Sequence, residues 1–305
     1  LSRRGDCATM EMASLPEQVD KETAKKWAGD KFDEAAFDQA AKDGTVAKME
    51  LLKFSVTSAQ IDAFMEKVGS SLQALDEGQV VLNWRCKEVN ASDCKVIAYL
   101  IASGALAQVT ELYLFENNIG DAGLTALADA CANGALAQVT SLELMCNKIG
   151  DAGLTALASA CASGALAQVT ELELYGNRIG DAGVSALADA CAKGALAQVT
   201  SLGLGGNKLG DAGIIALASA CAKGALAKVT NLSLRGNHIG DAGLAALADA
   251  CAKEALPTLN SLVLSYNQIS SKKAIREVAQ LREECGWGGF EVRMDCQQGC
   301  CCVMC

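Results

Sequence analysis

The C-terminal end of the chain carries the residues with the clearest capacity for chemistry. Six of the fifteen cysteines lie within the last 21 residues. Cysteine thiolates bind zinc and iron–sulfur clusters, and the candidate ligands are Cys296, Cys300, Cys302 and Cys305. Their spacing matches no metal motif that we can name, so we expect no metal and keep this site as an alternative.

The same cysteines also resemble a lipid-attachment signal. The final four residues are CVMC, which has the form of a prenylation box with Cys302 as the modified residue. Cys300 and Cys301 stand where palmitoylated cysteines are found. Two lipids would hold the protein at a membrane, although cysteine as the last residue is atypical of the box. A lipid-anchored adaptor and a local disulfide are therefore alternatives to a reduced tail.

The sequence does not supply the residues that most enzyme classes need. His238 is the only histidine, so a Ser-His-Asp or Cys-His arrangement has no support. The recurring GDAG segments lack the Lys-Ser/Thr pair of a phosphate-binding loop. Asp43, Gly44 and Glu50 have the spacing of a calcium loop, but its first two acidic ligands are missing. We therefore expect a non-catalytic protein without a cofactor.

Charge and hydropathy narrow the classes of partner and location. The formal net charge of −10 argues against a nucleic-acid partner, because it would repel phosphates. No apolar run reaches the roughly 18 residues of a transmembrane helix, so any membrane association would be peripheral. The first residues do not form a secretory signal. We expect a reducing, intracellular location, which is cytoplasmic or, if a targeting segment is removed before Leu1, organellar.

A sequence repeat of 30 residues predicts the elements that must position the side chains of this protein. Five near-copies fill residues 111–260, and the first is ELYLFENNIGDAGLTALADACANGALAQVT. The Leu-x-Leu segment predicts a short strand with one buried face. Helical spacing predicts one inward stripe for the following helix, and in the first copy this stripe is Leu124, Leu127, Ala128 and Cys131. Degenerate copies at 81–110 and 261–281 extend the array.

Three further positions recur once in each copy. The first column is Asn117, Asn147, Asn177, Asn207, Asn237 and Asn267, and we expect these amides to bond neighbouring backbone groups. The second column is Asp121, Asp151, Asp181, Asp211 and Asp241. Each aspartate precedes an apolar helical pattern, so we predict that it caps that helix. The third column is Cys131, Cys161, Cys191, Cys221 and Cys251. Stacked helices lie too far apart for disulfides here, so we expect small, buried, reduced thiols.

The order of strand, turn, helix and return resembles the leucine-rich repeats of the ribonuclease-inhibitor type. The segment LYLFENNIGDAGLTALA and its four sister copies carry the resemblance, which spans about residues 81–281. It implies a right-handed α/β solenoid, a horseshoe with a parallel inner sheet and outer helices. It also divides the chain into a helical N-terminal region at 1–80, the solenoid at 81–281, and a Cys-rich tail at 282–305.

The N-terminal region is predicted to be helical and to cap the first copy. The segment SLPEQVDKETAKKWAGD opens like a helix, with Ser14 as its cap. A second helix is predicted over Asp33–Lys42 and a third from Ser58 to Leu75. We expect these helices to cover the apolar edge that the first copy would otherwise expose.

The positions that flank Leu-x-Leu differ between copies, so we expect them to select a partner. Strand alternation places them on the concave, solvent-facing side of the sheet. The candidate partner-binding residues are Tyr113, Phe115, Glu116, Glu143, Met145, Glu173, Tyr175 and Arg235. In the first three copies they combine apolar anchors with carboxylates. The fourth copy is bare, with Gly203, Gly205 and Gly206, and the fifth turns basic.

We expect a protein–protein interaction scaffold or a peripheral subunit of a larger multi-subunit complex. The uniform, Ala-rich copies are also similar to leucine-rich-repeat proteins of unicellular algae, which implies an organellar, photosynthetic setting in a plastid as one alternative. The GDAGLTALA copies resemble leucine-rich-repeat GTPase activators as well, and this resemblance implies a regulatory alternative.

Overall fold

The computed structural model describes residues 56–70, 80–132, 136–271 and 291–293. Within these ranges a short strand and a helix alternate through most of the chain, one pair for each 30-residue copy. The strands are β1 (Val81–Asn83), β2 (Glu111–Tyr113), β3 (Ser141–Glu143), β4 (Glu171–Glu173), β5 (Ser201–Gly203), β6 (Asn231–Ser233), β7 (Ser261–Val263) and β8 (Glu291–Arg293). The helices are α4 (Ser58–Val68), α6 (Ala91–Ala102), α7 (Gly120–Cys131), α8 (Asp151–Ala162), α9 (Asp181–Ala192), α10 (Asp211–Cys221) and α11 (Asp241–Ala252).

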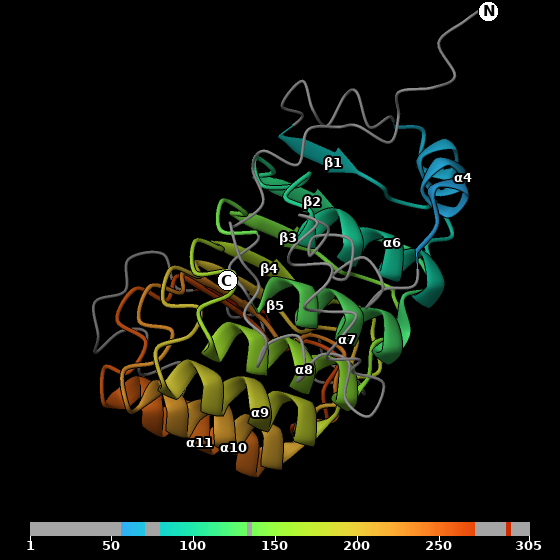
Figure 1. The fold of residues 1–305 in the computed structure, drawn as a ribbon. Coiled ribbons are helices and arrows are strands. Elements are labelled where there is room, and N and C mark those ends of the chain that lie inside the picture. Colours follow the sequence, from blue (N-terminus) through green and yellow to red (C-terminus); the bar gives the residue numbers. More distant parts are fainter. Residues whose placement is uncertain (1–55, 71–79, 133–135, 272–290, 294–305) are drawn as a thin grey trace, which may run out of the picture.

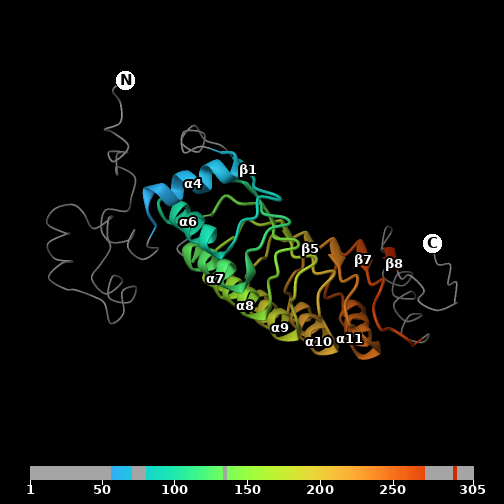
Figure 2. The same ribbon diagram turned by 90° about the vertical axis from the view of Figure 1, so that its right-hand side faces the viewer.

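The strands form one parallel sheet in which each strand pairs with the next along the chain, from β1 to β8. The register is a shift of one copy, so Leu112 lies beside Leu142, and Leu142 beside Leu172. Helices α6 to α11 line one side of the molecule and the strands the other (Figure 1, Figure 2). Packed helices need about 8–10 Å where parallel strands need about 4.8 Å, so the sheet forms the concave side. The predicted α/β solenoid is confirmed.

Small and medium apolar side chains fill the space between the sheet and the helices. Leu112 and Leu114 point inward from the copy that begins at β2, and both are buried. The predicted stripe of α7 faces them, since Leu124, Leu127, Ala128 and Cys131 are all buried. Burial of one leucine stabilises the fold by about 2 kcal/mol relative to exposure. A single copy cannot obtain this stabilisation alone, because the neighbouring copies supply the covering surface.

The asparagine column forms a ladder of buried amides between copies. The Nδ2 of Asn177 donates hydrogen bonds to the carbonyl oxygens of Leu144 and Leu174, both at 2.9 Å. Its Oδ1 accepts from the N–H groups of Asn147 at 2.9 Å and Ile149 at 3.0 Å. Among the described residues, every buried side-chain nitrogen and oxygen has a hydrogen-bond partner. The structural role predicted for this column is therefore confirmed.

Four residues of the aspartate column, Asp121, Asp151, Asp181 and Asp211, cap the helix of the following copy and not their own. Asp151 is the first residue of α8, and its Oδ1 accepts hydrogen bonds at the start of α9. The donors are the N–H groups of Gly180 at 2.6 Å and Gly183 at 3.0 Å. The same contacts join Asp121 to α8, Asp181 to α10 and Asp211 to α11. The prediction that each aspartate caps its own helix is wrong, because the carboxylate bridges two copies.

The glycines of the GDAG motif make room for this inter-repeat cap. A β-carbon at Gly183 would lie 2.8 Å from Oδ1 of Asp151, closer than such atoms approach. The copy that begins at β1 has Ala91 where the five regular copies have aspartate, so that copy supplies no carboxylate to the start of α7. The start of α7 also differs, since Gly120 adopts φ +61° and donates to the carbonyl of Asn147 at 2.9 Å.

Helix α4 covers the first end of the solenoid beside α6 (Figure 2). The ring of Phe64 packs edge-on against Trp84, with the centroids 5.1 Å apart. Trp84 stands where the other copies have their second leucine, and both aromatic side chains are buried. Nζ of Lys67 lies 2.7 Å from Oδ2 of Asp93, which fixes α4 to the start of α6. These contacts place α4 against the first end of the solenoid, while the cap over residues 1–80 stays a prediction.

Helix α4 ends at Val68, earlier than the predicted end at Leu75. Gly69 adopts the left-handed conformation with φ +69°, and its N–H bonds back into the last turn. The N–H of Ser70 also donates to the carbonyl of Met65 at 3.0 Å, which completes a glycine-terminated helix end. The apolar pattern alone could not show this stop, because it continues past the glycine.

Some predictions fall on residues outside the described ranges. They are the helices from Ser14 and over Asp33–Lys42, the calcium-like spacing at 43–50, and the metal and lipidation candidates Cys296, Cys300, Cys301, Cys302 and Cys305. Strand β8 is described, and it lies inside the segment 282–305 that the sequence placed beyond the repeats. It pairs in register with β7, with Val292 beside Leu262, so the sheet continues past residue 281. Among the described helices, none combines the length and the apolar character needed to cross a bilayer.

Candidate functional site

The register brings the variable positions of different copies together on the concave face. Between the two leucines, strands β2, β3 and β4 carry Tyr113, Glu143 and Glu173 side by side. Two residues further on, just after each strand, the same copies carry Phe115, Met145 and Tyr175. Backbone pairing continues there, since the N–H of Cys146 donates to the carbonyl of Tyr175 at 2.8 Å. The candidate residues therefore stand in two adjacent columns.

At the first end of this face, Arg85 joins two copies. Its guanidinium lies 4.2 Å from the ring centroid of Tyr113, and its Nη2 donates to Oε2 of Glu143 at 2.6 Å. The hydroxyl of Tyr113 donates to the carboxylate of Glu111. That hydrogen bond, followed by burial, raises the pKa of Tyr113 to about 12. Two of the candidate residues, Tyr113 and Glu143, thus already have partners within the chain, and we call this group the Arg85 cluster.

Side chains of the third copy cover the glycines of the fourth. A β-carbon at Gly203 would fall 1.8 Å from Oε2 of Glu173, so this carboxylate lies over the glycine. Burial raises the pKa of Glu173, although a hydrogen bond from Ser201 at 3.2 Å opposes the rise. The ring of Tyr175 lies over Gly205, where an added β-carbon would be 2.9 Å from it. The glycines of the fourth copy therefore lie beneath the side chains of Glu173 and Tyr175 from the third copy.

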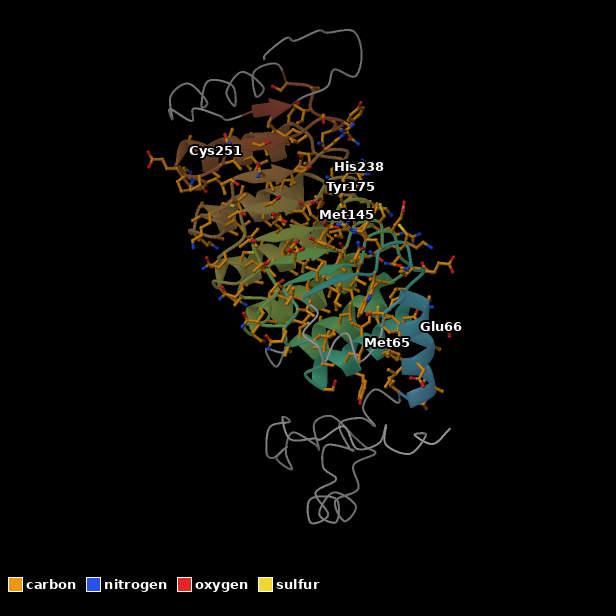
Figure 3. The ribbon with its side chains drawn as sticks, turned by 90° about the horizontal axis from the view of Figure 1, so that it is seen from above. Met65, Glu66, Met145, Tyr175, His238 and Cys251 are labelled. Carbon is orange, nitrogen blue, oxygen red and sulfur yellow. The ribbon has the colours of Figure 1, made fainter. Side chains whose placement is uncertain are left out.

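Phe115, Met145 and Tyr175 are neighbouring large side chains on the concave face that have no polar partner among the described residues. None of their side chains takes part in a hydrogen bond or ion pair with another described residue. Phe115 and Met145 are half-buried, and Tyr175 is 43% exposed. Met145 and Tyr175 lie near each other on the side of the solenoid away from Cys251 (Figure 3). We call these three residues the apolar strip.

The other two candidate residues lie at the margins of the face. Oε2 of Glu116 accepts a hydrogen bond from Sγ of Cys86 at 3.1 Å, and the guanidinium of Arg235 lies 4.7 Å from the ring centroid of Tyr266. Both Glu116 and Arg235 are exposed. The structure thus separates the candidates into three groups. They are the Arg85 cluster, the apolar strip with Glu173 beside it, and two residues at the margins of the face, Glu116 paired with Cys86 and Arg235 paired with Tyr266.

Sequence reasoning missed Arg85 and Tyr266, which form ring contacts with predicted residues. Both lie in degenerate end copies: Trp84 replaces the second leucine in the copy of Arg85, and the copy of Tyr266 keeps Leu262 and Leu264 but loses the GDAG motif. The 30-residue phase could have found them, because Arg85 stands in the column of Phe115 and Tyr266 in that of Glu116. A column is thus informative even where the copy around it has lost its motif.

The described residues do not assemble a metal site or a reactive thiol in the repeat columns. No three His, Cys, Asp or Glu side chains converge there on a metal-sized site. His238 is exposed, and its Nδ1 lies 3.2 Å from Nε2 of Gln268. Burial raises the thiol pKa to about 12 in Cys131, Cys161, Cys191 and Cys221. These thiols stay protonated at neutral pH, and Cys251 is buried as well. The predicted role of the column as small buried hydrophobes is confirmed.

Comparison with known families identifies the repeating unit. A family model described as "Leucine Rich repeat" matches residues 108–128, 138–158, 168–188, 198–218, 225–248 and 255–272. These six segments are similar to leucine-rich repeats. The apolar strip lies in the first three matched leucine-rich repeats, and the structure adds the β1–α6 unit ahead of them.

Solved structures with a similar arrangement include internalin C2 from Listeria monocytogenes. It is 22% identical with a TM-score of 0.44, over 78% of this chain and 93% of that one. The plant peptide hormone receptor RGFR1, in complex with RGF2, is 16% identical with a TM-score of 0.31, over 62% of this chain and 28% of that one. No curated protein sequence matches the chain significantly.

Proposed function

We propose that these leucine-rich repeats form a non-catalytic scaffold that binds a protein partner on the concave face of the sheet. Leucine-rich-repeat proteins generally act as protein-binding scaffolds. The observation that carries the proposal is the apolar strip: three large side chains on adjacent copies that lack polar partners, with Tyr175 43% exposed. Aromatic residues and methionine are enriched at the buried centres of protein interfaces.

The charges beside the apolar strip specify the chemistry of the partner. Glu116 and Glu171 are exposed, and Glu173 is a half-buried carboxylate whose pKa burial raises. A cation placed against Glu173 would offset the cost of burying its charge. The partner therefore presents an apolar anchor with lysine or arginine next to it. The Arg85 cluster displays the same chemistry within the chain, with a guanidinium against Tyr113 and Glu143.

The stacking of the copies makes the apolar strip a rigid surface. Each side chain follows a strand whose backbone pairs with the strands on both sides, and the asparagine ladder fixes the turn beyond it. This surface would then lose less conformational entropy on binding than flexible loops would. The 12-residue helices α7 and α8 support the ribonuclease-inhibitor-like type that we propose for the repeats.

Affinity capture with matched variants tests the proposal. The purified protein is immobilised, and proteins retained from an extract of its source cells are identified by quantitative mass spectrometry. The test variant is Phe115→Ala/Met145→Ala/Tyr175→Ala. The control, Val80→Ala/Ile215→Ala, truncates apolar side chains that are 46% and 45% exposed but lie away from the apolar strip.

We expect the apolar-strip variant to lose most of its retained partner while the control retains it, since truncation of a central aromatic anchor costs about 2 kcal/mol or more. Native mass spectrometry of the captured complex would then test whether the protein is a peripheral subunit of a larger assembly. If both variants retain the same proteins in the same amounts, the concave face is not the binding surface.

A further inference from the structure

A row of basic side chains follows the asparagine ladder along one margin of the sheet. The three residues, which we call the basic row, are Lys148, Arg178 and Lys208. All three are exposed, and each directly follows an asparagine of the ladder. Two of the backbones are held to the preceding copy: Arg178 N–H donates to the carbonyl of Ile149 at 2.7 Å, and Lys208 N–H to that of Ile179 at 2.8 Å, whereas Lys148 adopts φ +61°. The row therefore recurs at the spacing of the repeats.

The charges of the basic row are not compensated within the part of the chain that the structure describes. None of the three side chains takes part in a hydrogen bond or an ion pair there. The aspartates three positions later, Asp151, Asp181 and Asp211, direct their carboxylates at the first turn of the next helix. Those N–H groups already supply positive partial charge to the aspartates. The row is thus a local concentration of positive charge on a chain with net charge −10.

We propose that the basic row binds an extended acidic segment of a protein partner. Parallel strands are about 4.8 Å apart, so the three positions span roughly 10 Å, the length of three or four extended residues. Long lysine and arginine side chains can adjust to carboxylates that alternate along such a segment. A long nucleic acid fits less well, because the net charge of −10 repels phosphates beyond the row. The proposal goes beyond the apolar strip, which the basic row does not include.

Fluorescence anisotropy with defined peptides tests this inference. The probe is a labelled peptide of about ten glutamates, measured at low ionic strength, and a glutamine peptide of equal length is the uncharged comparison. The test variant is Lys148→Gln/Arg178→Gln/Lys208→Gln. The matched control, Lys193→Gln/Lys223→Gln/Lys253→Gln, removes the same charge from exposed lysines beyond the ends of α9, α10 and α11.

The test variant should bind the glutamate peptide about tenfold more weakly, which corresponds to three exposed ion pairs of about 0.5 kcal/mol each. The control should stay within about twofold of the unmodified protein. The single change Arg178→Gln should weaken binding about twofold, which keeps the test valid if the triple variant misfolds. Salt near 0.5 M should abolish binding, because exposed charges are then screened.

Four results would overturn the inference. They are no binding by the unmodified protein, equal losses in the test and control variants, equal binding of the glutamine peptide, and tighter binding of an oligothymidylate of equal charge. The last result would assign the basic row to phosphates instead of carboxylates. The apolar strip is intact in the basic-row variant, so the capture assay for the concave face is independent of this outcome.

Discussion

Replacement of Asp181 by alanine tests whether each aspartate stabilises its own helix or the next one. Oδ1 of Asp181 accepts hydrogen bonds from the N–H groups of Gly210 at 2.7 Å and Gly213 at 3.0 Å. Gly210 is the N-cap residue of α10 and has no side chain with which to cap it. Removal of a helix cap costs about 0.5–2 kcal/mol, and two hydrogen bonds to a charged acceptor place this site at the upper end. We expect Asp181→Ala to lower the free energy of unfolding by about 2 kcal/mol.

The matched control is Asp189→Ala, which removes the same charge from the same helix, α9. Asp189 is exposed on the outer face and bonds to none of the other described residues. Both substitutions also introduce the higher helix propensity of alanine, so the difference between them reports the cap. Urea unfolding followed by circular dichroism should give a change within about 0.5 kcal/mol for the control.

Hydrogen exchange measured by mass spectrometry locates the effect of Asp181→Ala. The bridging cap predicts that amide protection falls in the first turn of α10, at residues 211–214, because that turn loses its acceptor. A cap on its own helix would instead reduce protection in the first turn of α9. Loss confined to α9, or equal destabilisation by Asp181→Ala and Asp189→Ala, would refute the inter-repeat cap.

Four further changes test other contacts of the solenoid. Gly213→Ala should destabilise the protein by about 1 kcal/mol, because the added β-carbon would lie 2.7 Å from Oδ1 of Asp181. In a helix without this contact, alanine would instead stabilise by about that amount. A higher urea midpoint would contradict the contact. Asn177→Ala should lower the free energy of unfolding by about 3 kcal/mol, since four backbone groups lose their hydrogen-bond partner. A decrease below about 1 kcal/mol would show that water replaces the amide. Ala91→Asp should raise the free energy of unfolding by about 1 kcal/mol by supplying the missing cap of α7; no gain would mean that the cap does not form. Hydrogen bonds from backbone N–H and hydroxyl groups lower the pKa of Asp241. The carboxylate of Asp241 therefore stabilises the fold above its unfolded pKa of about 3.9, and this stability is lost as the pH falls through the lower folded pKa. The urea midpoint of Asp241→Asn should vary less with pH in this range than that of the unmodified protein. An unchanged pH profile would exclude this linkage.

The 30-residue period was sufficient to predict the strands, the inward helical stripe and the alignment of the columns. These features depend on alternation and helical spacing within one copy, and the register then follows from the repetition itself. The partner of Asp151 could not be predicted in this way. In an exact repeat, a contact within a copy and a contact with the next copy have the same sequence signature, so only the structure distinguishes Gly150 from Gly180.

The same limitation explains what the sequence could show of the candidate site. The residues of the apolar strip were predicted because strand alternation places them on the exposed side of the sheet. That Tyr113 and Glu143 contact Arg85 was not predicted, because Arg85 lies in a degenerate copy that showed little of the pattern. Helix α4 ends at Val68 for a local reason, the left-handed Gly69 that follows it, which the apolar period does not report.

The fourth copy shows why a repeat surface must be interpreted two copies at a time. By itself, Gly203 suggests a position where a partner could approach the backbone. In the folded chain it is buried beneath Glu173, and the neighbouring Gly205 is buried beneath the ring of Tyr175. Larger residues at either glycine would displace these side chains from where they lie. The glycines thus shape the concave face by accommodating side chains of the preceding copy, and the exposed part of that face is set by Tyr175 and its neighbours in the apolar strip.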